Sequence, residues 1–160
     1  MADIRTHYLD TSVIVKLLVD EDGSATIRTY LGRHATFATT SVCFAETLGV
    51  LKAKLVRKLL TEEQYLSACE ELMAFLRHGK IEIDDVGISQ RRTFDEVEQL
   101  TKKYSIDLSD AYQLVTLKRG LYSPLEGDSR PILVTADEDL AKAAKSEGLR
   151  AWDCLSEPAP

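Results

Sequence analysis

Residues 4–19 read IRTHYLDTSVIVKLLV, and this stretch decides the expected fold. The apolar run at residues 4–9 is typical of a strand, and the polar triplet Asp-Thr-Ser at residues 10–12 is typical of a helix start. Apolar residues then recur at helical spacing over residues 13–18. A strand that passes directly into a helix is the unit from which parallel sheets are built.

The same alternation continues along the chain. Further strands are predicted at residues 35–40, 80–86, 132–135 and 149–152. Further helices are predicted at residues 25–33, 41–60, 61–78, 89–104 and 138–146, and another, capped by Asp107 or Ser109, ends at Arg119-Gly120. This order indicates an α/β fold, with a mostly parallel sheet between helices and right-handed crossovers. The length of 160 residues suits one domain, expected over residues 1–155, with a frayed tail at 156–160.

Composition and charge narrow the classes of function. The 44% hydrophobic and 29% charged fractions are those of a globular domain, which excludes disordered, collagen-like and disulfide-scaffold proteins. Lys and Arg number 20 against 26 Asp and Glu, for a formal net charge of −6. This balance argues against a protein that coats nucleic acid through bulk positive charge, but it is compatible with a nucleic-acid enzyme.

The cysteines and the apolar runs predict a reduced, cytoplasmic protein. Cys43, Cys69 and Cys154 are widely spaced and form no C-x-x-C pair, so neither a zinc knuckle nor a disulfide framework is expected. Lys16 interrupts the apolar run at residues 13–19, which argues against a signal peptide. No uncharged run approaches the roughly 18 residues that a membrane span requires.

Four acidic residues are predicted to gather at the carboxyl edge of the sheet, where open parallel sheets place their functional sites. Asp10 and Asp137 directly follow strands, and Glu46 lies in the first turns of the helix after a strand. Asp110 opens a helix that must return the chain to the start of a parallel strand, so this helix is expected to begin at the same edge. All four carboxylates can therefore converge on one cleft.

Each of these acids also has a structural interpretation. Asp10 and Asp137 could be N-caps, and Asp110 could be a first-turn acid favoured by the helix dipole. Glu46 has small and apolar helical neighbours, so it needs a cation unless that edge of the helix is solvated. Clustered carboxylates repel one another until a proton or a metal neutralises them, and oxygen-only ligands favour Mg²⁺ or Mn²⁺. A metal held in this way can promote attack on a phosphodiester.

Four short motifs resemble, in the right order, those of the PIN-domain ribonucleases. They are YLDTSV at residues 8–13, TSVCFAETL at 40–48, LSDAYQL at 108–114 and LVTADEDLA at 133–141. The resemblance covers nearly the whole chain, and the small single domain is most similar to the VapC-type toxins of toxin–antitoxin pairs. It implies a PIN-like three-layer α/β/α fold with a five-stranded parallel sheet in the order 3-2-1-4-5.

The resemblance also implies the roles of particular residues. The catalytic acids would be Asp10, Glu46, Asp110 and Asp137, of which Asp10, Asp110 and Asp137 hold Mg²⁺ or Mn²⁺. Ser12 and Thr135 match supporting positions that orient metal-bound water or ligands. Asp139 is an additional acid that could share or replace the role of Asp137.

The partners implied by the resemblance are an RNA substrate, a second copy of the chain in a homodimer, and an antitoxin protein that blocks the acidic cleft. Cleavage of RNA would leave a 5′-phosphate and a 3′-hydroxyl. The helix at 61–78 and the loop at 121–131 make the chain longer than the shortest toxins. An RNA-processing nuclease outside a toxin–antitoxin pair therefore stays open as an alternative.

Basic residues could supply contacts to RNA. Lys52, Lys54, Arg57 and Lys58 cluster on the helix that carries Glu46, and other basic pairs occur at residues 91–92, 102–103 and 118–119. Most of them are interpreted as solvated helix faces, while a few near the cleft could bind phosphates.

Other functions fit the residues less well. An aspartyl phosphatase would need a second Asp two residues after Asp10, where Ser12 stands. A phospho-accepting receiver domain would need adjacent acids before its acceptor strand and a late strand-end Lys, and neither is found. A degenerate PIN fold that only binds a partner is the remaining alternative, although all four acids are present. The sequence thus predicts a metal-dependent endoribonuclease.

Overall fold

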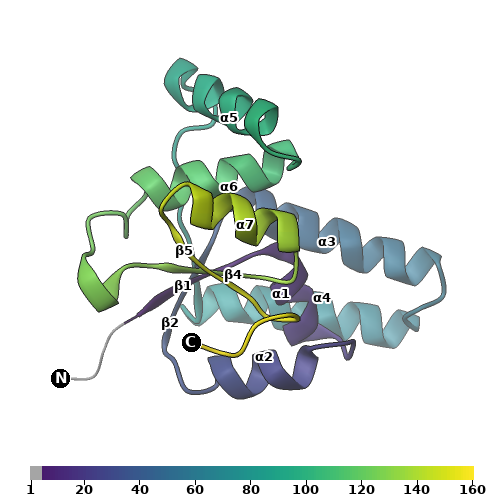
Figure 1. Cartoon of the computed structure of the whole chain (residues 1–160). Coiled ribbons are helices and arrows are strands. Elements are labelled where there is room, and N and C mark those ends of the chain that lie inside the picture. The colour runs from purple at the N-terminus through teal and green to yellow at the C-terminus, as the bar shows by residue number, and fades with distance from the viewer. Residues whose placement is uncertain (1–4) are drawn as a thin grey trace.

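A five-stranded parallel sheet forms the centre of the protein, shown by a computed structural model that describes residues 5–160 (Figure 1). Its strands are β1 (Thr6–Leu9), β2 (Thr36–Thr39), β3 (Ile81–Ile83), β4 (Ile132–Thr135) and β5 (Arg150–Asp153). They lie in the order β3-β2-β1-β4-β5, and every pair is parallel. The predicted α/β class and strand order are confirmed. Ile4, the predicted start of the first strand, lies outside the described residues.

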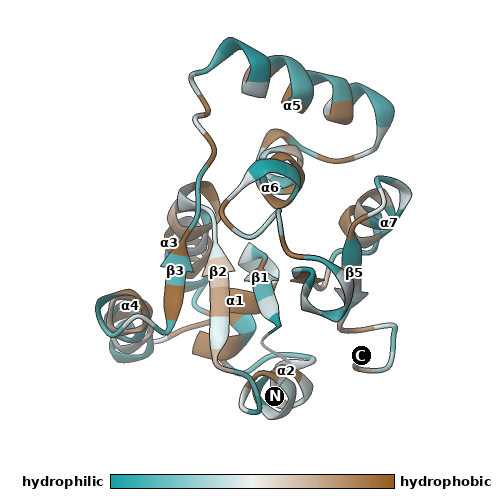
Figure 2. Ribbon diagram, turned by 90° about the vertical axis from the view of Figure 1, so that its left-hand side faces the viewer, coloured by the Kyte–Doolittle hydropathy of each residue, from teal (hydrophilic) through white to brown (hydrophobic). Residues whose placement is uncertain are grey.

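Helices cover both faces of this sheet (Figures 1 and 2). On one side lie α1 (Thr11–Leu18), α2 (Ser24–Leu31), α3 (Ser41–Val56) and α4 (Glu62–Arg77), with α3 alongside α1 and α4. On the other side lie α6 (Leu108–Arg119) and α7 (Glu138–Ser146), and α5 (Arg91–Lys103) packs outside α6. The outer position of α5 agrees with its largely hydrophilic surface in Figure 2. A 3-10 turn, Gly127–Ser129, precedes β4.

The two faces of the sheet contribute to separate hydrophobic cores, because successive strand side chains point to opposite faces. Leu9 and Val134 pack with residues of α1 to α4, whereas Tyr8 and Leu133 pack with residues of α5 to α7. All four of these side chains are at most 1% exposed. The central strands are thus held rigidly from both sides, and the residues at their carboxyl ends are fixed in position.

Two predicted elements end three or more residues earlier in the structure than in the sequence analysis. The helix predicted at 41–60 ends at Val56, and Lys58, with a φ of 59°, turns the chain towards α4. The strand predicted at 80–86 is only β3, and the Asp84 side chain that follows it accepts hydrogen bonds from the Tyr8 hydroxyl and the Leu121 amide.

The chain end is anchored where fraying was predicted to begin. Ser156 donates a hydrogen bond to the Asp153 carboxylate, and the indole N–H of Trp152 donates to the carbonyl of Glu157 at 3.1 Å. The first two residues of the tail, for which fraying is expected from the sequence, thus have hydrogen-bond partners on β5.

Most basic residues of α5 and α6 form ion pairs with acidic residues of the same domain. Lys103 and Lys118 both form ion pairs with Glu147, and Arg119 pairs with Glu96 at 3.1 Å. Hydrogen bonds from the two lysines and from Tyr104 lower the pKa of Glu147 to about 2. These contacts fasten α5 to α6 and to the end of α7, which favours a structural interpretation of these cations.

Within residues 5–160, no helix combines the length and the apolar character that crossing a bilayer requires. Cys43, Cys69 and Cys154 are all free thiols.

The buried imidazole of His7 predicts a loss of stability in mild acid. Its Nε2 lies 3.1 Å from the Tyr30 hydroxyl, and burial together with the nearby His34 lowers its pKa from 6.5 to about 4. Between these values the unfolded chain takes up a proton that the folded chain refuses, so stability falls as the pH falls. We expect a loss of about 2 kcal/mol from this group between pH 6.5 and 4.5.

Urea unfolding of the wild type and of His7→Gln at both pH values would measure this effect. The variant has no imidazole at this position, so its free energy of unfolding should decline less than that of the wild type. Equal declines in the two proteins would show that other groups cause the acid sensitivity.

Candidate active site

Asp10 lies at the carboxyl end of β1 and is the first residue of the candidate site. Its side chain is buried, with 5% of the residue exposed, and two hydroxyls donate to its Oδ2: Ser12 Oγ at 2.6 Å and Thr135 Oγ1 at 2.9 Å. Burial raises the pKa of Asp10 against the opposing effect of these hydrogen bonds. Asp10 occupies the N-cap position of α1 but makes no side-chain capping bond. Asp10 is therefore the N-cap of α1 by position, while its side chain makes its contacts with Ser12 and Thr135 instead of capping the helix.

The two hydroxyls beside Asp10 are themselves held by the turn after β4. The backbone N–H of Ala136 donates to Ser12 Oγ, and the N–H of Asp137 donates to Thr135 Oγ1, each at 3.0 Å. Since each hydroxyl accepts from the backbone, its own hydrogen is directed at Asp10. The first and fourth sequence motifs are joined through these bonds.

Glu46 reaches the cleft from α3 and is half-buried. Thr11 Oγ1 donates to its Oε2 at 2.7 Å, and Ser109 Oγ lies 3.4 Å from the same oxygen. Three segments far apart in the sequence therefore meet at this carboxylate. Thr11 and Ser109 were not predicted as site residues, although both lie within the motifs that carry Asp10 and Asp110.

Asp107 and Asp110 divide two roles at the start of α6. Asp107 is the N-cap, and its Oδ1 accepts from the N–H of Asp110 at 3.0 Å. Asp110 is free of the capping role and lines the cleft. Burial raises the pKa of Asp110 to about 8, with further contributions from the negative charges of Asp10, Asp107, Asp137 and Glu46. The acids are therefore close enough to feel one another strongly.

Asp137 does cap its helix, as one of its two sequence interpretations predicted. Its Oδ1 accepts from the N–H groups of Asp139 and Leu140, at 2.8 and 3.0 Å, and the residue also lines the cleft. The Asp139 side chain is exposed and does not line the cleft. Asp137 is therefore the acid of this motif that lies in the cleft, and Asp139 is not.

A cleft of about 360 Å³ unites these residues. Its lining comprises Asp10, Thr11, Ser12, Val15, Glu21, Glu46, Val50, Lys54, Asp107, Asp110 and Asp137. All four predicted acids are in this set, together with residues that the sequence analysis did not assign, Glu21 among them.

The family of the chain follows from its sequence match. Residues 7–146 match the PIN domain. The chain belongs to the PIN-domain family. Members of this family are typically nucleases that use divalent metals. Because the match spans all four motifs, the predicted resemblance to this family is confirmed at the level of the domain.

Among solved structures, this PIN domain is similar to the crystal structure of PAE2754 from Pyrobaculum aerophilum. The TM-score is 0.60 at 17% sequence identity, over 92% of this chain and 90% of that chain. At this identity the similarity shows the fold alone. No curated protein matches the sequence.

The donor groups of the PIN-domain cleft fit a hard divalent cation. They are carboxylates and hydroxyls, the oxygen ligands that Mg²⁺ and Mn²⁺ prefer, and their mutual repulsion calls for positive charge. Over residues 5–160, no three acidic, imidazole or thiol side chains form a ready-made cage for an ion. The acids therefore line the cleft without meeting at one point.

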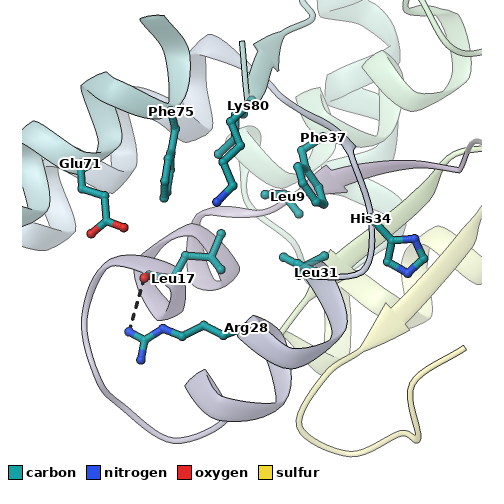
Figure 3. A pocket seen from close by; sticks show the side chains of 11 residues that line it. Leu9, Leu17, Arg28, Leu31, His34, Phe37, Glu71, Phe75 and Lys80 are labelled. Atoms are coloured by element: carbon teal, nitrogen blue, oxygen red, sulfur yellow. Dashed lines mark hydrogen bonds between the residues drawn. The ribbon is translucent and has the colours of Figure 1, made fainter. Parts of the chain in front are cut away.

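A second hollow lies between α1, α2, α4 and the strands β2 and β3 (Figure 3). Its volume is about 290 Å³, and Leu17, Leu31 and Phe37 contribute to its mostly apolar lining. Figure 3 shows Lys80 reaching in between Phe75 and Phe37. Glu71 is the one acid in its lining, so this hollow lacks the carboxylates that phosphodiester chemistry with a metal would need.

Proposed function

We propose that this PIN-domain protein is a metal-dependent endoribonuclease. The observation that carries the proposal is the gathering of Asp10, Glu46, Asp110 and Asp137 in one cleft, where burial and the neighbouring negative charges together raise the pKa of Asp110 to about 8. Isolated capping acids would not be brought together in this way. A divalent cation in the cleft, Mg²⁺ or Mn²⁺, would be bound by these carboxylates and would neutralise their mutual repulsion.

Asp10, Asp110 and Asp137 are the residues that would hold the metal. When bound, the ion would stabilise negative charge on the phosphodiester and lower the pKa of a water molecule. Asp10 is kept in place by Ser12 and Thr135, so its carboxylate needs little reorganisation.

Glu46 completes the metal shell or positions the attacking water. It reaches the cleft from α3, and the hydrogen bond from the Thr11 hydroxyl directs its carboxylate. Attack by water on the phosphorus, with departure of the 3′-oxygen of the preceding nucleotide, leaves a 5′-phosphate and a 3′-hydroxyl. Asp139 has no role in this proposal because it lies outside the cleft lining.

We further propose that the protein is the toxin of a toxin–antitoxin pair and acts as a homodimer. The small size of the domain and its resemblance to VapC-type toxins support this role, and an antitoxin could place a basic side chain among the acids. An RNA-processing nuclease would use the same cleft. Induced expression in a bacterial host separates the two: a toxin arrests growth, and the arrest disappears when Asp10 is replaced by Asn.

The nuclease proposal is tested with a mixed pool of RNA incubated with the protein and Mn²⁺, Mg²⁺ or EDTA. We expect cleavage with either metal and none with EDTA, and sequencing of the ends should show 5′-phosphates. If a folded protein leaves the pool uncut, its unfolding temperature is measured with and without Mn²⁺. A rise in the unfolding temperature would then indicate a narrow RNA target, whereas no rise would contradict the proposal and favour a binding module without catalysis.

A further inference from the structure

Glu21 and Lys54 line the acid cleft, and Lys16 pairs with Glu21 from behind the lining. These three ion-paired residues are here called the lysine wall. Glu21 Oε1 lies 2.8 Å from Lys16 Nζ, and Glu21 Oε2 lies 2.8 Å from Lys54 Nζ. The Lys16 side chain is only 9% exposed, and those of Glu21 and Lys54 are 25% and 23% exposed. These are partly desolvated contacts, so they persist better in salt than surface ion pairs do.

The lysine wall is connected to the acids by the helices on either side of the cleft. Glu46, Val50 and Lys54 recur every four residues on α3, so they share the face that lines the cleft. Ser12 and Val15 line it from α1. The eight residues from Glu46 to Lys54 correspond to roughly 12 Å along the helix axis. The cleft is therefore a groove with the acids at one end and Lys54 at the other.

Charge within the lysine wall is not balanced. Glu21 uses both carboxylate oxygens, one for each lysine, and the three groups together carry one net positive charge. Burial would raise the pKa of Glu21, but the hydrogen bonds from Lys16 and Lys54 outweigh it and lower that pKa. Glu21 is thus ionised and occupied, and it is not available as a further metal ligand.

Lys54 is the more exposed of the two lysines that pair with Glu21. Glu21 compensates the buried charge of Lys16, and the second lysine on the same acid leaves the three groups with an excess positive charge on the cleft side, where an anion can approach it. Among the described residues that line the cleft, Lys54 is the sole cation, facing six acids. A cleft so acidic would repel a nucleic-acid strand without such a charge.

We propose that Lys54 binds a phosphate of the RNA strand, namely one that neighbours the scissile phosphate. The strand would then follow the groove between α1 and α3. This inference rests on the proposed nuclease function. Glu21 holds the ammonium of Lys54 at the groove wall, which limits the entropy lost when a phosphate binds it. The acids then receive the scissile phosphate, and Lys54 sets the direction of the strand.

Binding of RNA without cleavage tests the role of Lys54. Fluorescence anisotropy is measured with a short fluorescein-labelled single-stranded RNA of mixed sequence, in the Asp10→Asn background with Mg²⁺. Lys54→Gln should weaken binding about fivefold at 0.1 M salt and reduce the slope of log affinity against log salt by about 0.7, the value for one phosphate contact on a single strand. Lys54→Arg should stay within about twofold, because Arg also binds phosphate.

Lys52→Gln is the matched control, since Lys52 is an exposed cation on the same helix but outside the cleft. Its affinity and salt slope should equal those of the background protein. Thermal unfolding confirms that Lys54→Gln is folded, as the retained pair of Lys16 and Glu21 predicts.

The possible outcomes separate the two proposals. If Lys54→Gln and Lys52→Gln bind RNA equally while the wild type still cleaves RNA with metal, the role of Lys54 is refuted and the nuclease function stands. If Lys54→Arg loses as much affinity as Lys54→Gln, positive charge at this place is not what binds the strand, and the inference is also refuted. A wild type that neither binds nor cleaves RNA removes both proposals.

Discussion

Replacing Asp10 by Asn is expected to lower metal-dependent RNA cleavage by about 100-fold or more, because the loss of a mere supporting partner of a metal ligand already costs 10- to 100-fold. Asp10 is the most buried of the four acids and the one on which two fixed hydroxyls converge. An amide oxygen at this place keeps the shape but not the charge that would bind the ion. Initial rates of cleavage of a labelled RNA, at saturating Mn²⁺, measure the effect.

The same substitution should leave the protein folded. The Asn carbonyl can still accept a hydrogen bond from Ser12 or Thr135, and the change removes a charge that burial penalises and that contributes to the raised pKa of Asp110. The free energy of unfolding without metal should therefore be unchanged or higher. A marked loss of stability in Asp10→Asn would mean that the residue is structural and that the loss of activity has no bearing on catalysis.

Asp139→Asn provides the matched control. Asp139 is an acid of the same motif as Asp137, exposed on α7, and its side chain lies outside the cleft. The backbone N–H that it donates to Asp137 is unaffected by the substitution. Activity within about twofold of the wild type is expected, since surface changes away from a site have small effects. If Asp139→Asn lost as much activity as Asp10→Asn, the assignment of Asp137 would have to be shared with Asp139.

The fold and the placement of the four acids could be predicted because both depend on local patterns and on topology. Short apolar runs followed by helix starts specify parallel strands, and the right-handed crossover then brings the start of α6 to the same edge as Asp10. The position of Asp110 was inferred in this way, with no strand directly before it. The position of Asp137 followed from the strand that precedes it.

The lysine wall could not be predicted because it depends on contacts between distant segments. Glu21 lies in a Glu-Asp-Gly-Ser stretch that indicates only a break between helices. Its partner Lys54 is 33 residues away and stands among other basic residues of the same helix. Only the packing of α1 against α3 distinguishes Lys54 from Lys52. The hydrogen bond from Thr11 to Glu46 likewise depends on the packing of segments that are distant in the sequence.

Gly120 illustrates a residue whose sequence interpretation was incomplete. As a glycine at the end of α6, it indicates a helix stop, yet its φ of −75° is open to any residue. The structure gives a different reason for glycine: a Cβ here would lie 2.3 Å from Asp84 Oδ2 and 2.6 Å from the Thr116 carbonyl oxygen. Space, and not backbone conformation, therefore excludes a side chain.

Gly120→Ala is accordingly expected to lower the free energy of unfolding by about 2–4 kcal/mol, from overpacking and from the disturbance of a buried acceptor. Asp84 accepts from the Tyr8 hydroxyl and from the Leu121 N–H, so displacing its carboxylate leaves buried donors of β1 and of the α6 end unpaired. Chemical denaturation at neutral pH measures the loss. RNA cleavage by the fraction that remains folded should be normal, because neither Gly120 nor Asp84 lines the acid cleft.

The opposite result is expected for the same substitution at Gly49. This residue is exposed within α3, and nothing lies within 4 Å of a Cβ added there. Alanine restricts the unfolded chain and favours the helix, so Gly49→Ala should raise stability by about 0.5–1 kcal/mol. The pair of variants separates the two explanations of Gly120: if Gly120→Ala were as well tolerated as Gly49→Ala, the close approach of Asp84 to the end of α6 would not be the reason for glycine at this position.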